Sequence, residues 1–298
     1  MTIINTSNSV AFSKACLIFS FLLVSLTLYA QSTTINPINF TSKKIKLSGA
    51  IYAAKDPKAG VVIVHGSGQE LRSIELASFL ANNGISVLTY DKRGVGESGG
   101  EYAGPEVGTN NIDPYNLDLL ATDVQEALKA LKEFIQDNNV PVGLFGGSQA
   151  GWIIPIAADK CKKTDFIVLL SGPVIPTLEQ LRFQFFTNGN RNFWDTHSEL
   201  EVRQHISNAP DKFQFVNTDP VKSLKRLKIP GLWLFGDKDI QVPIRLSIEK
   251  LENLKSEGKD FDYKIFPNFG HNLSISASME PTKFAIGWIK SLAERINN

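Results

Sequence analysis

The chain has 298 residues, of which 43% are hydrophobic and 20% charged, a composition typical of a globular protein that buries a sizeable core. Lys and Arg number 31 and Asp and Glu number 30, so the formal net charge is only +1. With charges this balanced and no basic stripe along the chain, no nucleic-acid partner is expected.

The first thirty residues differ from the rest of the chain. Lys14 is their only charged residue, and residues 15–28 are almost wholly apolar. This run is shorter than the roughly 20 apolar residues that a membrane-spanning helix needs, and its place is typical of a secretory signal peptide. We therefore predict a signal peptide over residues 1–30, with an uncleaved anchor as the alternative. Cleavage before Gln31 would leave a periplasmic or secreted protein with no stable membrane span.

Cleavage would also remove Cys16 and leave Cys161 as the single cysteine, so no intrachain disulfide is expected. Residues 31–298 contain no repeat, low-complexity tract or block of like charge. We predict that they form one domain, and the sequence gives no indication of its oligomeric state.

Short apolar, β-branched runs alternate with helical patterns through this domain. The predicted strands cover residues 60–64, 86–90, 142–145, 166–170, 232–235 and 261–266. In the clearest helical pattern, apolar residues recur at 3.6-residue spacing at Leu117, Leu120, Val124, Leu128 and Leu131. Such alternation predicts an α/β fold with a mainly parallel central sheet and helices on both faces. Ligand chemistry in such sheets lies at the carboxyl ends of the strands.

Residues 172–222 interrupt the alternation, because they contain no clear strand. Their aromatic residues are Phe183, Phe185, Phe186, Phe193, Trp194, Phe213 and Phe215. We predict a short cap insertion at about these residues. Its aromatic side chains could form a small core of the cap itself or wall an acyl pocket, since binding pockets are mostly apolar.

A candidate nucleophile follows the strand predicted at 142–145. This strand leads into Gly-Gly-Ser-Gln-Ala-Gly at 146–151 and then into a helical stretch, which is the setting of a nucleophile elbow with Ser148 at its tip. The small residues Gly146 and Ala150 allow the tight turn that holds such a serine. A glycine-rich turn with an incidental serine is the alternative.

A serine hydroxyl needs a base in contact with it and an acid that orients the base. His271 is the candidate base, because it follows the last predicted strand. Asp239 and Asp237 both follow the strand at 232–235; Asp239 is preferred, although either could be a turn former. The order Ser148, Asp239, His271 is the order in which nucleophile-elbow hydrolases carry their triad.

The turn His-Gly-Ser-Gly at 65–68 follows the strand predicted at 60–64 and offers exposed backbone amides. We predict that the N–H groups of Ser67 and Gln149 form an oxyanion hole, which receives the negative charge of the tetrahedral intermediate. His65 is a rival base, but its place before the glycine turn favours a bracing role.

Two glycine-rich stretches could suggest nucleotide binding, and both lack a required feature. Trp152 follows residues 146–151 where a phosphate-binding loop has lysine, and residues 94–99 do not open a helix. No metal or organic cofactor is therefore expected.

The motifs at 65–68, 91–98 (DKRGVGES), 146–151, 236–243 and 270–273 (GHNL) together resemble the α/β-hydrolase superfamily, in particular its serine-aminopeptidase-like branch of bacterial carboxylesterases. The resemblance implies the triad Ser148, Asp239 and His271, the oxyanion donors Ser67 and Gln149, and a structural role for Arg93 in the turn after the strand at 86–90. In this sequence Gly147 stands where a larger residue is common, and the predicted cap is short for the branch.

The expected activity is hydrolysis of a small-molecule carboxylic ester through an acyl-enzyme. One alternative is a serine peptidase, in which Glu179, Glu199 or Glu201 would bind a substrate ammonium. The other is a hydrolase fold without catalytic activity that acts as a binding module.

Overall fold

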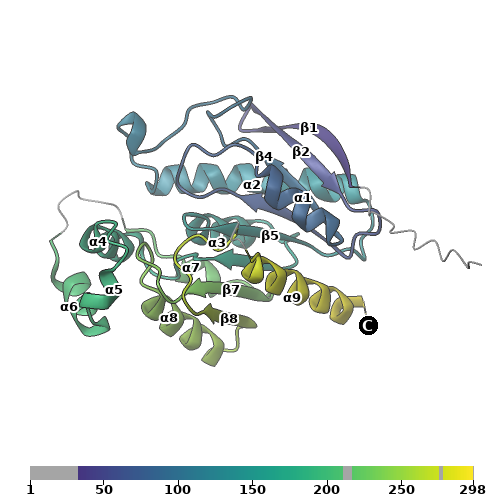
Figure 1. Cartoon of the computed structure of the whole chain (residues 1–298). Coiled ribbons are helices and arrows are strands. Elements are labelled where there is room, and N and C mark those ends of the chain that lie inside the picture. The colour runs from purple at the N-terminus through teal and green to yellow at the C-terminus, as the bar shows by residue number, and fades with distance from the viewer. Residues whose placement is uncertain (1–32, 211–216, 275–277, 298) are drawn as a thin grey trace, which may run out of the picture. The chain divides into compact units, whose positions relative to one another are not determined.

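An eight-stranded sheet with the strand order β1-β2-β4-β3-β5-β6-β7-β8 forms the centre of the molecule (Figure 1). The computed structural model describes residues 33–210, 217–274 and 278–297. The strands are β1 (Thr34–Ser42), β2 (Ile45–Ala53), β3 (Ala59–Val64), β4 (Ile85–Tyr90), β5 (Val142–Gly147), β6 (Ile167–Leu170), β7 (Gly231–Gly236) and β8 (Phe261–Phe266). The predicted signal peptide, residues 1–30, lies outside the described residues and stays a prediction.

Strands β3 to β8 run parallel to one another, and these are the six strands predicted from the sequence. β1 and β2 form an antiparallel hairpin that joins the sheet beside β4, and the sequence analysis did not predict them. The hairpin turns at Lys43 and Lys44, whose φ angles are +49° and +66°. Two-residue hairpin turns with positive φ normally carry Asn or Gly, so this turn lacks the usual sequence signal.

Helices cover both faces of the sheet (Figure 1). They are α1 (Ile74–Asn82), α2 (Pro114–Ile135), α3 (Ala150–Lys160), α7 (Val221–Leu224), α8 (Ile244–Ser256) and α9 (Glu280–Asn297). Helices α1 and α9 bury their apolar side chains in one core cluster, and α2, α3 and α8 in a second on the opposite face. Burial on both faces explains why the central strands are apolar throughout.

Helix α2 shows how the sequence determines one of these elements. The Asp113 side chain accepts a hydrogen bond from the Tyr115 N–H, and Pro114 occupies the first helical position. Both features favour a helix start at this point. The predicted apolar face, from Leu117 to Leu131, is buried against the sheet as expected.

The helices α4 (Thr177–Thr187), α5 (Phe193–Thr196) and α6 (Glu199–Asn208) follow β6 in the chain and precede α7. We call them the α4–α6 segment. They have a small core of their own, made by Phe183, Phe193, Val202 and Ile206. Ser198 and Glu201 form a capping box that starts α6. No helix among the described residues is long and apolar enough to cross a membrane.

Candidate active site

Ser148 lies at the carboxyl edge of the sheet, between the end of β5 and the start of α3. Its φ angle is +54°, a left-handed conformation that costs a non-glycine residue on the order of 1 kcal/mol or more. Two hydrogen bonds hold the turn: the Ser148 N–H donates to the Leu170 carbonyl at 3.2 Å, and its own carbonyl accepts from the Gly151 N–H at 2.8 Å. This is the strained strand-to-helix turn that the sequence motif predicts.

The glycines around Ser148 allow close packing of the turn. A Cβ on Gly146 would lie 2.6 Å from the Val64 carbonyl oxygen, and one on Gly151 would lie 2.5 Å from the Pro173 side chain. A Cβ on Gly147 would lie 2.8 Å from the carbonyl oxygen of Leu170 on β6. The departure noted at Gly147 therefore has a steric cause, since β6 approaches too closely for a larger residue.

His271 and Asp239 meet across the loops that follow β8 and β7. The His271 Nδ1 lies 2.9 Å from the Asp239 Oδ2, while the Asp239 Oδ1 accepts from the Gln241 and Val242 amides at 2.7 and 2.9 Å. Asp239 is only 1% exposed. Asp237 instead accepts a hydrogen bond from the Asn268 N–H at 2.6 Å. Of the two candidate acids, the structure thus brings Asp239 to His271, and Asp237 has a turn-forming role.

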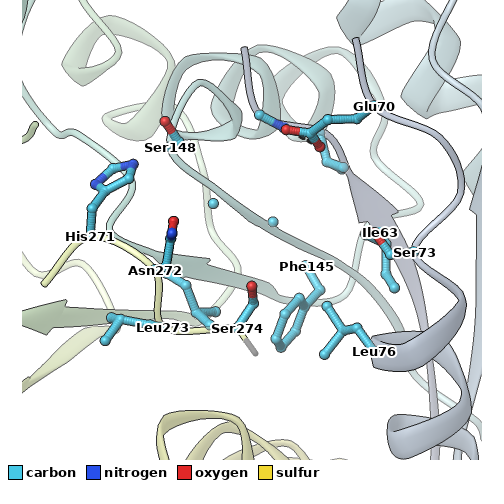
Figure 2. Close-up of a pocket in the computed structure, with 15 residues that line it drawn as sticks. Ile63, Glu70, Ser73, Leu76, Phe145, Ser148, His271, Asn272, Leu273 and Ser274 are labelled. Carbon is cyan, nitrogen blue, oxygen red and sulfur yellow. Dashed lines mark hydrogen bonds between the residues drawn. The ribbon is translucent and has the colours of Figure 1, made fainter. Parts of the chain in front are cut away.

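A cavity of about 150 Å³ is lined by both Ser148 and His271. Figure 2 shows the His271 imidazole turned toward the Ser148 hydroxyl, with Glu70 on the other side of the cavity. The three candidate side chains, which come from the ends of β5, β7 and β8, therefore converge at one edge of the sheet. A hydroxyl, an imidazole and a buried carboxylate that contact one another in this order can perform nucleophilic acyl transfer.

A second and larger cavity, of about 790 Å³, also reaches Ser148. It lies against α4 and the loop that contains the short 3₁₀ helix η1 (Pro105–Val107). Phe185 on α4 lines it and is 52% exposed, whereas Phe183 and Phe193 are buried in the core of the α4–α6 segment. Some of the predicted aromatic residues therefore form a core of the cap, and Phe185 lines a pocket. Phe213 and Phe215 lie outside the described part of the chain.

Both predicted oxyanion donors, Ser67 and Gln149, line this cavity. The Ser67 carbonyl accepts from the Tyr102 hydroxyl at 2.8 Å and from the Asn111 side chain at 3.1 Å. Within the described residues, no group accepts a hydrogen bond from the Ser67 or Gln149 N–H. Both amides are therefore available to a developing oxyanion.

His65 has the bracing position expected of it. Its Nε2 lies 2.6 Å from the Tyr90 carbonyl oxygen, and it lines neither cavity beside Ser148. Burial lowers the pKa of His65 to about 4, and the nearby charge of Lys92 acts in the same direction. The imidazole is therefore neutral at physiological pH and ties the end of β3 to the end of β4.

The other histidines and Arg93 also have structural contacts. His197 stacks on Phe193 and His205 stacks on Phe186, and both are partly buried. Arg93 pairs with buried Asp123 and donates to the Ser42 carbonyl at 3.2 Å. This contact holds the hairpin to α2, the kind of role that the resemblance implied.

The sequence analysis missed the contacts that hold the Asp239 loop from the α4–α6 segment. The Trp194 indole N–H donates to the Asp239 carbonyl at 2.7 Å. The Thr187 hydroxyl and the Gln180 side chain donate to the carbonyls of Ile240 and Gln241 at 2.7 and 2.8 Å. No periodicity or motif indicates such contacts, because they join an inserted helix to a loop distant in the sequence.

In the described part of the chain, neither a metal-ligand cluster nor any of the glutamates Glu179, Glu199 and Glu201 accompanies the candidate triad. The structure has no cluster of three His, Cys, Asp or Glu side chains there that could hold a metal ion. Glu179 lines a different cavity, Glu199 pairs with Arg203, and Glu201 belongs to the capping box of α6. The three glutamates considered for a substrate ammonium therefore lie outside the two cavities that reach Ser148.

Residues 55–222, more than half of the chain, match the protein family described as serine aminopeptidase, S33. The chain belongs to this family. Esterase EstD of Thermotoga maritima is 27% identical over 245 residues, which cover 72% of this S33-family chain and 56% of EstD. Across the three curated relatives that match, the chain spans between 56% and 30% of their length.

Solved structures show the fold of this S33-family protein. An esterase from Pyrococcus furiosus matches with a TM-score of 0.63 at 17% identity, covering 90% of this chain and 93% of that one. The α/β-hydrolase GrgF from a Penicillium species matches with a TM-score of 0.61 at 15% identity, covering 88% and 99%. The prediction of an α/β-hydrolase fold is confirmed.

Proposed function

We propose that this protein is an exported serine hydrolase that cleaves small-molecule carboxylic esters. The observation that carries the proposal is the position of His271, which contacts Asp239 through Nδ1 at 2.9 Å and turns its ring toward the Ser148 hydroxyl (Figure 2). A base oriented in this way by a buried carboxylate makes a serine nucleophilic at neutral pH. The similarity to esterase EstD supports the choice of an ester as substrate.

In the proposed reaction, the Ser148 Oγ attacks the ester carbonyl carbon while its proton passes to His271. The N–H groups of Ser67 and Gln149 donate to the oxyanion of the tetrahedral intermediate. The C–O bond to the leaving alcohol then breaks, and His271 gives its proton to that alcohol. Water deprotonated by His271 attacks the carbonyl carbon of the acyl-enzyme, and the bond from this carbon to the Ser148 Oγ breaks. The Oγ takes the proton back from His271, which releases the carboxylic acid and restores the free enzyme.

The two cavities suggest where the two halves of the ester bind. His271 must protonate the leaving alcohol, and it lines the smaller cavity of about 150 Å³. The acyl group then faces the larger cavity of about 790 Å³, and the described residues that line it include no Asp, Glu, Lys, Arg or His. This arrangement favours esters of small alcohols with an uncharged acyl group.

The deciding experiment compares Ser148→Ala with Ser256→Ala, an exposed serine at the end of α8 that lines neither cavity. Ser148→Ala should abolish hydrolysis of p-nitrophenyl butyrate and labelling by a fluorophosphonate, with an unchanged Tm. Ser256→Ala should keep both activities. Turnover by Ser148→Ala at the wild-type rate would refute the proposed nucleophile.

A peptidase activity is the second candidate, because the family is described as serine aminopeptidase. An aminopeptidase needs an anionic group for the substrate ammonium, and among the described residues that line the smaller cavity Glu70 is the one acidic side chain. Its carboxylate already accepts from the Gly66 N–H at 3.0 Å. We therefore expect kcat/KM for an amino-acid p-nitroanilide to be far below that for the ester, and the reverse order would favour the peptidase.

A third candidate, a binding module without catalysis, predicts no fluorophosphonate labelling of the wild-type chain at all. The same assay therefore separates it from both enzymes.

Export is proposed from the sequence pattern of residues 1–30. Expression of the full chain in a bacterial host, followed by fractionation and N-terminal sequencing, tests it. A protein that begins at Gln31 outside the cytoplasm is the expected result. Full-length protein retained in the cytoplasm would contradict the proposal.

A further inference from the structure

Lys92 is a buried lysine at the end of β4, and nothing in the reaction described above uses it. It is only 2% exposed. Its ammonium donates to the Gly66 carbonyl at 2.6 Å, to the Gly68 carbonyl at 3.2 Å and to the Gln149 Oε1 at 3.2 Å. Three acceptors thus match the three N–H bonds of the ammonium group.

The contacts of Lys92 join the two halves of the proposed oxyanion hole. Gly66 and Gly68 flank Ser67, the first proposed donor, and Gln149 is the second. These segments are distant in the sequence and come from the ends of β3 and β5. A single side chain from the end of β4 therefore connects both of them.

The bond to the Gly66 carbonyl also sets the direction of the Ser67 N–H. The Gly66 C=O and the Ser67 N–H belong to one peptide unit, and the described chain contains no cis peptide bond. In a trans peptide these two groups point in opposite directions. Because Lys92 holds the carbonyl on one side, the amide hydrogen must point to the other.

Neighbouring bonds restrict this peptide further. The Gly66 N–H donates to the Glu70 carboxylate at 3.0 Å, so the residue is held at both its amide and its carbonyl. The Gln149 side chain, which is 1% exposed, donates to the Asn111 carbonyl at 2.6 Å while its oxygen accepts from Lys92. Both donor segments are therefore fixed before any substrate binds.

The surroundings of Lys92 give its charge little direct compensation. No carboxylate of the described residues lies within ion-pair distance of its Nζ, although the Tyr102 ring lies 5.5 Å away. A buried ammonium without an ion pair is costly, so hydrophobic packing does not explain a lysine at this position.

We propose that Lys92 is a positioning residue that orients the Ser67 and Gln149 amides toward the developing oxyanion and adds its positive charge behind them. This inference rests on the proposed function, because it requires acyl transfer at Ser148. It predicts that Lys92 acts mainly on the transition state and little on substrate binding.

The proposed role of Lys92 should depend on pH, because it requires the protonated form of the amine. Burial lowers the pKa of Lys92 to about 8, while Glu70 and Glu106 oppose this effect. The neutral His65 ring and the ion-paired Asp91 lie nearby, and neither changes charge between pH 7 and 10. Above pH 8 a neutral amine has only two N–H bonds for three acceptors, so kcat should fall in this range.

The test compares Lys92→Met with Lys129→Met, an exposed lysine on α2 that serves as the matched control. With a p-nitrophenyl ester, Lys92→Met should lower kcat about 100-fold or more, as loss of an oxyanion donor does, with KM changed less than threefold. Lys129→Met should keep the wild-type values. Rates of Ser148→Ala at each pH provide the blank for spontaneous ester hydrolysis.

The outcomes separate this inference from the proposed function. If Lys92→Met folds and keeps its kcat within threefold while Ser148→Ala is inactive, the inference is wrong and the proposed function stands. If Ser148→Ala remains active, the proposed function is refuted, and the inference about Lys92 is refuted with it. If Lys92→Met does not fold, the wild-type profile decides: a kcat that stays constant from pH 7 to 10 overturns the inference, and a fall above pH 8 supports it.

Discussion

Gly236 at the end of β7 packs directly against Phe269 in the loop that carries His271. A Cβ on Gly236 would lie 2.3 Å from the Phe269 carbonyl oxygen and 2.4 Å from that of Gly270. The Lys238 N–H donates to the same Phe269 carbonyl at 2.9 Å. The loops of the candidate acid and base are thus held together by backbone contacts as well as by their side chains.

We therefore expect Gly236→Ala to separate these loops. Overpacking of this kind costs about 1 to 3 kcal/mol, which lowers the Tm by roughly 2 to 4 °C per kcal/mol in a protein of this size. Ester hydrolysis should fall as well, because His271 is displaced. Gly287→Ala is the control: apart from its chain neighbours and the backbone of its own helix, no atom lies within 4 Å of the added Cβ, and alanine within a helix should be neutral or stabilising. An unchanged Tm and kcat in Gly236→Ala would contradict the assigned contact.

The two aspartates after β7 should differ sharply in their effect on activity. Asp239→Asn removes the charge that orients His271 and should lower kcat by roughly 1000-fold or more, as loss of a triad carboxylate does elsewhere. Asp237→Asn affects only the turn at Asn268 and should keep kcat within a few-fold. Steady-state kinetics on one ester settle the assignment, and equal losses in the two variants would count against it.

The buried His65 should make stability depend on pH. Its pKa is about 4 in the folded protein and about 6.5 when unfolded, so between these values the unfolded chain binds a proton that the folded protein does not. Stability must therefore fall as pH decreases from 6.5 to 4, by up to about 3 kcal/mol from this residue. In His65→Gln, urea unfolding should show a shallower pH dependence than in the wild type. The same slope in His65→Gln and in the wild type would disprove the role of His65.

Trp194→Phe tests whether the α4–α6 segment supports the acid loop. Phenylalanine keeps the ring packing against Phe183 and Phe193 but cannot donate to the Asp239 carbonyl. One lost hydrogen bond is worth about 1 kcal/mol, so kcat should fall by up to about tenfold and the Tm by no more than roughly 2 to 4 °C. Trp288→Phe, in α9, changes the same chemical group away from the site and should leave kcat unaltered. A Trp194→Phe enzyme as fast as the wild type would show that the contact has no influence on the reaction.

The sequence predicted the parallel part of the sheet because β3 to β8 are apolar and alternate with helical patterns. It could not predict the β1–β2 hairpin, since Lys43 and Lys44 adopt positive φ angles without the residues that normally indicate them. The preference for the left-handed conformation here comes from the pairing of the strands and not from the side chains of the turn.

The same contrast holds for the candidate site. Strand ends and chain order were enough to select Ser148 and His271, but Asp237 and Asp239 have nearly the same local sequence. Only the path of the loop after β8 determines which carboxylate reaches the imidazole. The roles of Lys92 and Trp194 depend on contacts with carbonyl groups of other segments, and backbone acceptors leave no pattern in a sequence.

The backbone at residue 148 has one more consequence. Its φ of +54° is a conformation that glycine adopts without steric cost, whereas serine must be held in it by the surrounding turn. A glycine at this position would make the molecule more resistant to heat and would remove the proposed nucleophile. Thermostability therefore favours glycine at this position, whereas catalysis requires serine. A variant selected only for thermostability could acquire glycine here and lose its activity.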